Sequence, residues 1–186
     1  MVFPIGKTVI PEKCVMGLSV EKPIIPPSIL AAAKEQNLNI KREFHISVLV
    51  AKNARIAAGS VMVRPHSEQF RKQLLDLFET YRWEYIETDE FYMHERYYTK
   101  EILHDNGYDE GIPEHTRRTI VQKVDLPDLS KFYADVNSLL GLSLPVPVAH
   151  ITIFSWSDHS PMLLRGIGIN SAVEFDEFTK RRLPST

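Results

Sequence analysis

The 186-residue sequence has little of the material that builds disulfide-stapled, fibrous or membrane-spanning proteins. Its only cysteine is Cys14, so no internal disulfide can form and a cysteine-rich zinc site is excluded. No apolar run approaches the length of a membrane helix, and charged residues interrupt the first 20 residues before a signal-peptide core can form. We therefore expect a cytoplasmic protein with no membrane partner.

An excess of charge of one sign is absent as well. The chain has 22 Lys and Arg against 24 Asp and Glu, with an isoelectric point near 6.4. Proteins that grip long duplex nucleic acid usually carry a strongly basic face, so we expect no such partner. Apolar residues make up 44% of the chain and aromatic residues 10%, which is enough for a packed core and too much for a disordered chain.

The hydrophobic pattern predicts an α+β fold with antiparallel sheets, because strands outnumber helices and βαβ alternation is rare. Helices are predicted at 28–38, with Ser28 as N-cap, at 67–81, and at 128–140, ended by Gly141. Residues 101–116 are polar and contain two glycines and a proline, which is typical of a long surface loop. Strands are predicted at 44–50, 83–88, 91–99, 117–126, 146–154, 162–169 and 172–178.

Two of the predicted strands carry the same short motif. His45 and Ser47 lie in Phe-His-Ile-Ser-Val, and His150 and Thr152 lie in Ala-His-Ile-Thr-Ile. Residues i and i+2 of a strand point to the same face, so each motif presents an imidazole beside a hydroxyl, with apolar residues on the opposite face. Roughly 0.07 such apolar-flanked triplets are expected by chance in this composition, and the chain has two.

A single such histidine is most simply a core residue whose ring is satisfied by a neighbour. Two matching pairs favour a shared site instead, because buried polar side chains need partners and one ligand can satisfy all four groups. The alternative of purely structural histidines stays open at this point.

The paired motifs, about a hundred residues apart, resemble those of the two-histidine (2H) phosphoesterase superfamily, which includes 2′,3′-cyclic nucleotide phosphodiesterases and RNA-end or oligonucleotide-processing enzymes. The resemblance spans roughly residues 40–178. It implies a bilobal, pseudo-symmetric fold whose central cleft is lined by the four motif residues. Ala149 stands where members often carry proline, and Ser47 replaces the commoner threonine. The resemblance therefore implies a lead-in with a short helix over 1–40 and one bilobal domain over 41–186.

The chemistry of the four side chains suits a phosphodiester without help from the resemblance. One neutral and one protonated imidazole can supply the general base and the general acid near neutral pH. The hydroxyls of Ser47 and Thr152 can hold the non-bridging oxygens. We expect no metal and no cofactor, because the nearby acidic residues Glu43 and Asp158 form no recognisable ligand spacing.

Two aromatic residues are further candidates for substrate binding. Trp156 follows the second motif and is expected to stack on a base, with core packing as the alternative. Tyr98 ends an alternating series that suits a nucleotide-facing wall, with an exposed strand face as the alternative. That series is Tyr92, His94, Arg96 and Tyr98. Lys180, Arg181 and Arg182 are expected to form a solvated tail.

The sequence thus predicts a metal-independent phosphoesterase acting on a 2′,3′-cyclic nucleotide, a short oligonucleotide or an RNA end. His45 and His150 are the predicted acid and base, in an order that the sequence does not set. A non-catalytic nucleotide-binding module on the same scaffold is the alternative, and an interaction protein with structural histidines is a third.

Overall fold

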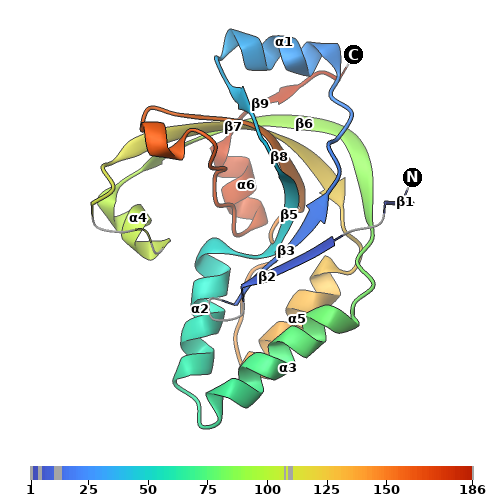
Figure 1. Cartoon of the computed structure of the whole chain (residues 1–186), viewed down its shortest axis with the longest axis vertical. Coiled ribbons are helices and arrows are strands. Elements are labelled where there is room, and N and C mark those ends of the chain that lie inside the picture. Colours follow the sequence, from blue (N-terminus) through green and yellow to red (C-terminus); the bar gives the residue numbers. More distant parts are fainter. Residues whose placement is uncertain (1, 4–5, 11–13, 107, 109–110, 186) are drawn as a thin grey trace.

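A single antiparallel sheet runs through the whole molecule (Figure 1). The computed structural model describes residues 2–3, 6–10, 14–106, 108 and 111–185. The strands are β1 (Val2–Phe3), β2 (Gly6–Ile10), β3 (Val15–Val20), β4 (Asn39–Ile40), β5 (Phe44–Leu49), β6 (Tyr85–Tyr98), β7 (His115–Asp125), β8 (His150–Ser157) and β9 (Thr179–Leu183). Their order is β1-β6-β7-β8-β5-β3-β2, with β4 beside β8 and β9 beside β6. The predicted α+β class with an antiparallel sheet is confirmed.

Three of the helices follow the sequence prediction. The helices are α1 (Pro27–Glu35), α2 (Ala51–Met62), α3 (Ser67–Thr80), α4 (Lys100–Asp105), α5 (Leu129–Leu140) and α6 (Ala172–Phe178), with a 3₁₀ turn, η2, at Ser160–Met162. The predictions for α1, α3 and α5 are confirmed, and Gly141 ends α5 in the left-handed conformation. Ser28 is not the N-cap of α1, since its hydroxyl donates instead to the Pro184 carbonyl. No helix in the described ranges is long and apolar enough to cross a membrane.

Several predicted boundaries were wrong for identifiable reasons. The predicted strands 83–88 and 91–99 are one strand, β6, whose register shifts between Glu87 and Phe91, so the residues between the two predicted ranges form a bulge. The predicted strand 172–178 is helix α6, because the Ser171 side chain accepts a hydrogen bond from the Glu174 amide and caps a helix. Residues 162–169 form no strand, and the strand predicted from 146 begins only at His150.

The segment predicted as a loop over 101–116 is partly regular. Thr99 caps α4 by accepting from the Ile102 amide, and β7 begins at His115. Gly107, Asp109 and Glu110 lie outside the described residues. Helix α2 was not predicted at all.

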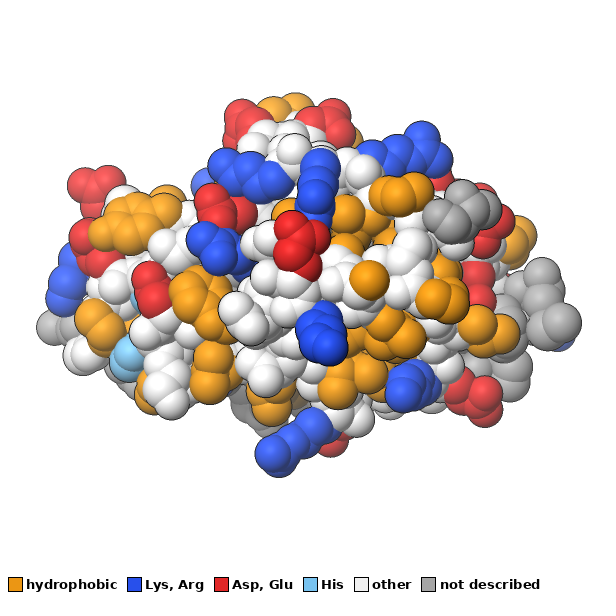
Figure 2. Space-filling model, turned by 90° about the horizontal axis from the view of Figure 1, so that it is seen from above, with side chains coloured by type: hydrophobic (Ala, Val, Ile, Leu, Met, Phe, Trp, Pro, Cys, Tyr) orange, Lys and Arg blue, Asp and Glu red, His pale blue; other side chains and the backbone are white. Residues whose placement is uncertain are grey.

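The basic C-terminal residues are exposed, as expected, but they do not form a tail. They belong to β9, which pairs with β6, and each of them faces a carboxylate. Lys180 lies 3.8 Å from Glu95, Arg181 lies 3.7 Å from Glu35 and Arg182 lies 2.9 Å from Glu90. Figure 2 views the end of the molecule that carries α1 and β9, where positive and negative side chains are interspersed.

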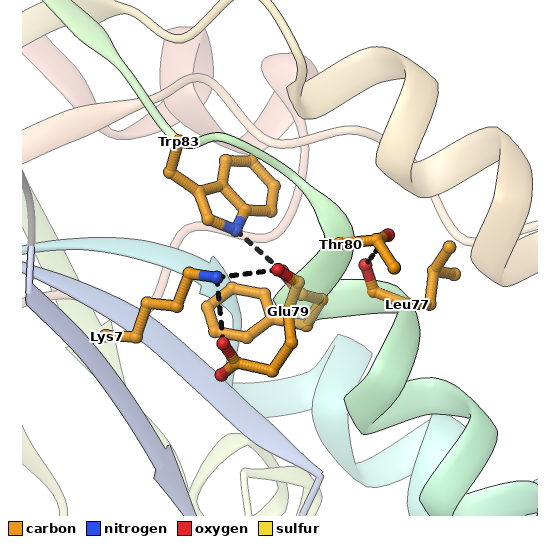
Figure 3. Close-up of polar contacts among 6 residues, drawn as sticks. Lys7, Leu77, Glu79, Thr80 and Trp83 are labelled. Carbon is orange, nitrogen blue, oxygen red and sulfur yellow. Dashed lines mark hydrogen bonds and ion pairs between the residues drawn. The ribbon is translucent and has the colours of Figure 1, made fainter.

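The first 40 residues contribute strands that the sequence did not predict. β3 pairs with β5 along its length, and β2 pairs with β3. Lys7 ties β2 to the end of α3, where its ammonium donates to both the carbonyl and the carboxylate of Glu79 at 2.9 Å (Figure 3). The Trp83 indole donates to the Phe78 carbonyl in the same turn. The N-terminal segment is therefore built into the sheet that carries the motifs.

The two faces of the sheet pack differently. Helices α2, α3 and α5 cover one face and form the main core, which includes Ile46, Val48, Ile151 and Ile153. Helix α6 lies within the curve of the other face and forms a smaller core around Phe175. We call this second face, which carries the motif histidines, the site face.

The centre of the main core generates a stability prediction. Phe132 is fully buried and makes edge-to-face contacts with Phe78, Tyr81 and Trp83. Phe132→Ala should lower the free energy of unfolding by about 3–5 kcal/mol, the usual cost of emptying a buried aromatic site. Urea denaturation measures this change. The matched control is Val173→Ala on the exposed side of α6, which should change stability by less than about 0.5 kcal/mol.

Candidate active site

The two motif strands are direct neighbours in the sheet. β5 and β8 are antiparallel, with Ile46 opposite Ile151. This register places His45 opposite Thr152 and Ser47 opposite His150, so all four side chains emerge together on the site face. We call these four residues the tetrad. Diagonal neighbours across an antiparallel pair are about 7–8 Å apart, which is the expected spacing of the two histidines and leaves room for one phosphate between them.

Solvent reaches the tetrad from the β5 side. His45 is exposed, Ser47 and Thr152 are half-buried, and His150 retains 7% of its accessible surface. The His150 ring is oriented by a 2.8 Å hydrogen bond between its Nδ1 and the carbonyl of Val148. Because a carbonyl only accepts, Nδ1 carries the proton and Nε2 is the nitrogen left for exchange.

Both tetrad histidines are held toward the neutral form. Burial lowers the pKa of His150, the Val148 carbonyl opposes this, and the charge of His45 lowers the pKa further. His45 is exposed as a residue, but partial desolvation of its imidazole is still the largest cause of its lowered pKa. The charge of Lys41 is the next cause, while Glu43 acts in the opposite direction. The charge of His45 therefore reaches the His150 imidazole, as is expected of groups that share one site.

The structure separates Trp156 from the tetrad. The ladder between β7 and β8 pairs Val121 with Thr152 but Ile120 with Phe154, so Ile153 is an extra residue in β8. A bulge of this kind shifts the alternation by one residue, so the side chains beyond it point to the face opposite the one that regular alternation would give. Trp156 consequently lies on the opposite face from Thr152, where the Arg118 guanidinium covers its ring at 5.0 Å.

Tyr98 is on the site face but closed off from solvent, with 1% of its surface accessible. Its ring stacks on His115 at 5.2 Å and contacts the guanidinium groups of Arg96 and Arg117 at 5.1 and 4.2 Å. Its hydroxyl accepts a hydrogen bond from the Gly168 amide. Tyr98 therefore supports neighbouring side chains and offers no surface to a ligand in this structure.

A segment without regular structure, residues 163–171 between η2 and α6, lies against the tetrad. A Cβ placed on Gly166 would lie 3.2 Å from the Thr152 hydroxyl, so only glycine allows this close approach without displacing Thr152. Arg117 donates to the Gly166 carbonyl, and Ser155 donates to the Leu163 carbonyl. The sequence analysis did not identify this segment, because no periodic pattern marks it.

The histidines and acidic residues do not assemble a metal centre within the described ranges. No group of three or more His, Cys, Asp or Glu side chains there is placed to hold a metal ion. Comparison with protein-family models, with curated proteins and with solved structures finds no match to this chain. The functional argument therefore rests on the geometry and chemistry of the tetrad and its surroundings.

A third buried histidine on the site face generates a prediction about acid stability. His94 is fully buried and lies 4.5 Å from the Phe175 ring. Its Nε2 donates to the Thr179 hydroxyl, which in turn donates to the Phe175 carbonyl. Burial, reinforced by the charge of His150, lowers the pKa of His94 to about 3.

Since the folded pKa of His94 is below the unfolded value of about 6.5, its contribution to stability is complete above pH 6.5 and is lost as the pH falls. Between pH 6.5 and pH 5, wild type should lose about 2 kcal/mol more unfolding free energy than His94→Gln. Urea denaturation at the two pH values gives both losses. His104→Gln, at an exposed histidine of α4, should behave like wild type. Equal losses in wild type and His94→Gln would contradict this assignment.

Proposed function

We propose that this protein is a metal-independent phosphoesterase that hydrolyses a 2′,3′-cyclic nucleotide or a phosphodiester of a short oligonucleotide or RNA end. In this proposal β2, β3 and β5 belong to one lobe, β6, β7 and β8 to the other, and the tetrad lies at their junction. This is the bilobal arrangement expected of a 2H phosphoesterase. The observation that carries the proposal is the opposed register of the two motifs on neighbouring strands.

The roles of the side chains follow from their chemistry. One imidazole takes a proton from water as the water attacks phosphorus, and the other gives a proton to the leaving ribose oxygen. The Ser47 and Thr152 hydroxyls donate to the non-bridging oxygens, where negative charge increases in the transition state. His150 exchanges its proton at Nε2, because Nδ1 is held by the Val148 carbonyl.

The charge around the site supports an anionic ligand. Lys41 lies close enough to His45 to lower its pKa, and Lys123 lies opposite His150 in the adjoining strand β7. Lys123 is paired with Glu90 at 2.9 Å, whereas Lys41 has no carboxylate within ion-pair distance among the described residues. An anion bound between the imidazoles gains from both histidine protonation and these cations.

Substitution of the tetrad gives the most direct test. Assayed in EDTA on 2′,3′-cyclic mononucleotides and short oligonucleotides, His45→Ala and His150→Ala should each lower kcat/KM by about 10²–10⁴-fold, because each removes a positioned acid or base. Ser47→Ala and Thr152→Ala should cost about 10–10³-fold, since each removes one donor to a charged oxygen. Circular dichroism checks that every variant is folded.

His104→Ala is the control, because this exposed histidine lies on α4 outside the tetrad and its loss should leave the rate unchanged. If either His45→Ala or His150→Ala kept the wild-type turnover rate, the two-histidine mechanism would be contradicted. Tight nucleotide binding with no turnover by the wild-type protein would instead assign the non-catalytic binding module.

The lowered histidine pKa values predict an acidic optimum. The mechanism needs one neutral and one protonated imidazole, so kcat/KM should be bell-shaped between two apparent pKa values that belong to the pair. Around His150 lie His45 and His94 with Lys123, and around His45 lie Lys41 and Glu43. Because both tetrad pKa values are lowered, we expect the maximum below pH 6.5. A maximum above pH 7.5 in a steady-state pH series would contradict this.

A further inference from the structure

Lys41 is brought to the tetrad by an irregular link between β4 and β5. β4 pairs Ile40 with Phe154, whereas β5 pairs Ile46 with Ile151, so the link contains more residues than the stretch of β8 that it faces. The link bulges as a result, and Lys41 is fixed within it by a 2.9 Å hydrogen bond from its amide to the Ile153 carbonyl. This places Lys41 beside Thr152 and within electrostatic reach of His45.

The side chain of Lys41 contacts the segment 163–171. Its ammonium donates to the carbonyl of Leu164, the residue before Arg165. Arg165 is exposed, and the following residue, Gly166, lies against the Thr152 hydroxyl. Arg165 is thus carried by the segment that contacts the tetrad, and its charge reaches the Lys41 ammonium.

The backbone that carries Arg165 is held by a regular set of contacts. Lys41, Arg117 and Arg96 donate to the alternate carbonyls of residues 164, 166 and 168, the last at 2.8 Å. Arg117 is the most deeply placed of these cations, with 1% of its surface accessible. Arg96 and Arg117 are thus positioning residues that fix the segment. The Arg165 side chain is exposed, with its guanidinium 5.7 Å from the centre of the Tyr108 ring.

The cations around this segment differ from those elsewhere on the sheet in their lack of acidic partners. Arg118 of β7 and Arg182 of β9 each pair with a glutamate of β6 within 3 Å. No carboxylate among the described residues forms an ion pair with the segment's cations, which are Lys41, Arg96, Arg117 and Arg165. Burial, and then the charge of Arg165, lowers the pKa of Lys41, while the charge of Glu43 acts in the opposite direction. Positive charge is therefore concentrated here without an ion-pair contact to a carboxylate.

We propose that Lys41 and Arg165 bind a second, uncleaved phosphate of the substrate, so that the protein prefers nucleotides that carry an additional phosphate beside the scissile one. This inference rests on the proposed phosphoesterase function. Lys41 is half-buried and Arg165 is exposed, unlike Arg117. The Lys41 backbone lies beside Thr152, which would hold the scissile phosphate, and Arg165 precedes Gly166, which lies against the Thr152 hydroxyl. A phosphate accepts several charge-assisted hydrogen bonds at once, which a single backbone carbonyl cannot match.

Two paired substrates test this preference. Adenosine 2′,3′-cyclic phosphate and its 5′-phosphorylated form differ only by the second phosphate. Wild type should show a kcat/KM at least about tenfold higher for the 5′-phosphorylated form, the range expected for a hydrogen bond to a charged group. Lys41→Gln and Arg165→Gln should each bring the ratio of the two kcat/KM values toward one, and Lys41→Arg should restore it.

The matched control is Arg42→Gln, which removes one positive charge from an exposed neighbouring position and should keep the wild-type ratio. Arg165→Gln alters an exposed side chain, so its result is free of folding effects even if Lys41→Gln is unstable. A wild-type ratio near one, or a ratio unchanged in both Lys41→Gln and Arg165→Gln, would overturn the inference.

Calorimetric binding separates this inference from the proposed function. Adenosine 3′,5′-bisphosphate should bind wild type at least about tenfold more tightly than adenosine 3′-phosphate, and Arg165→Gln should abolish the difference. If this holds without turnover of either cyclic substrate, the second phosphate site stands and the hydrolase function fails. If both cyclic substrates are turned over equally and the two nucleotides bind equally, only the second site fails.

Discussion

The candidate site depends on one register, that of Ile46 opposite Ile151 at the centre of the sheet. A slip of one residue would turn every side chain of β5 to the other face, sending His45 and Ser47 into the main core. The apolar residues on the opposite face prevent this, because each fully buried side chain contributes about 1.5–3 kcal/mol that a slip would lose. Those residues are Ile46, Val48, Ile151 and Ile153, each completely buried. The same packing therefore builds the core and aligns the tetrad.

The bulge at Ile153 has effects on both sides of β8. It allows Ile153 and Phe154 to enter the main core in succession, which regular alternation would forbid. Beyond the bulge, Ser155 rather than Trp156 lies on the site face. The Ser155 hydroxyl donates a hydrogen bond to the Leu163 carbonyl. One extra residue thus removes an aromatic side chain from the site and anchors the segment that closes over Thr152.

Each imidazole–hydroxyl pair of the tetrad could be predicted from sequence because its geometry is local. The i, i+2 relation between His45 and Ser47 holds on any strand, whatever its neighbours. Trp156 could not be placed, because a bulge is a property of two paired strands and leaves no mark in one of them. Lys41 was missed for a similar reason, since it lies in an irregular link fixed by contacts to β8.

The secondary structure shows the same contrast between features set by local sequence and features set by contacts far along the chain. The long amphipathic helices α3 and α5 were predictable, because many turns repeat one pattern. Helix α6 was not, because its seven residues fit either an alternating or a helical period, and only the Ser171 cap decides between them. The early strands β2 and β3 were missed because prolines and a glycine obscure their alternation, while the pairing with β5 that orders β3 lies far along the chain.

The partners of the cations near the tetrad bear on how the site responds to a ligand. Backbone carbonyls hold Lys41, Arg96 and Arg117 in place without cancelling their charge, as carboxylates would. The charge of Lys41, opposed in part by Glu43, helps keep His45 neutral while the site is free. A bound phosphate reverses the balance, because its negative charge favours protonated imidazole. Phosphate binding therefore favours protonation of an imidazole, and protonation favours phosphate binding to the same extent. This coupling acts at the pH where the mechanism needs one histidine to carry the proton.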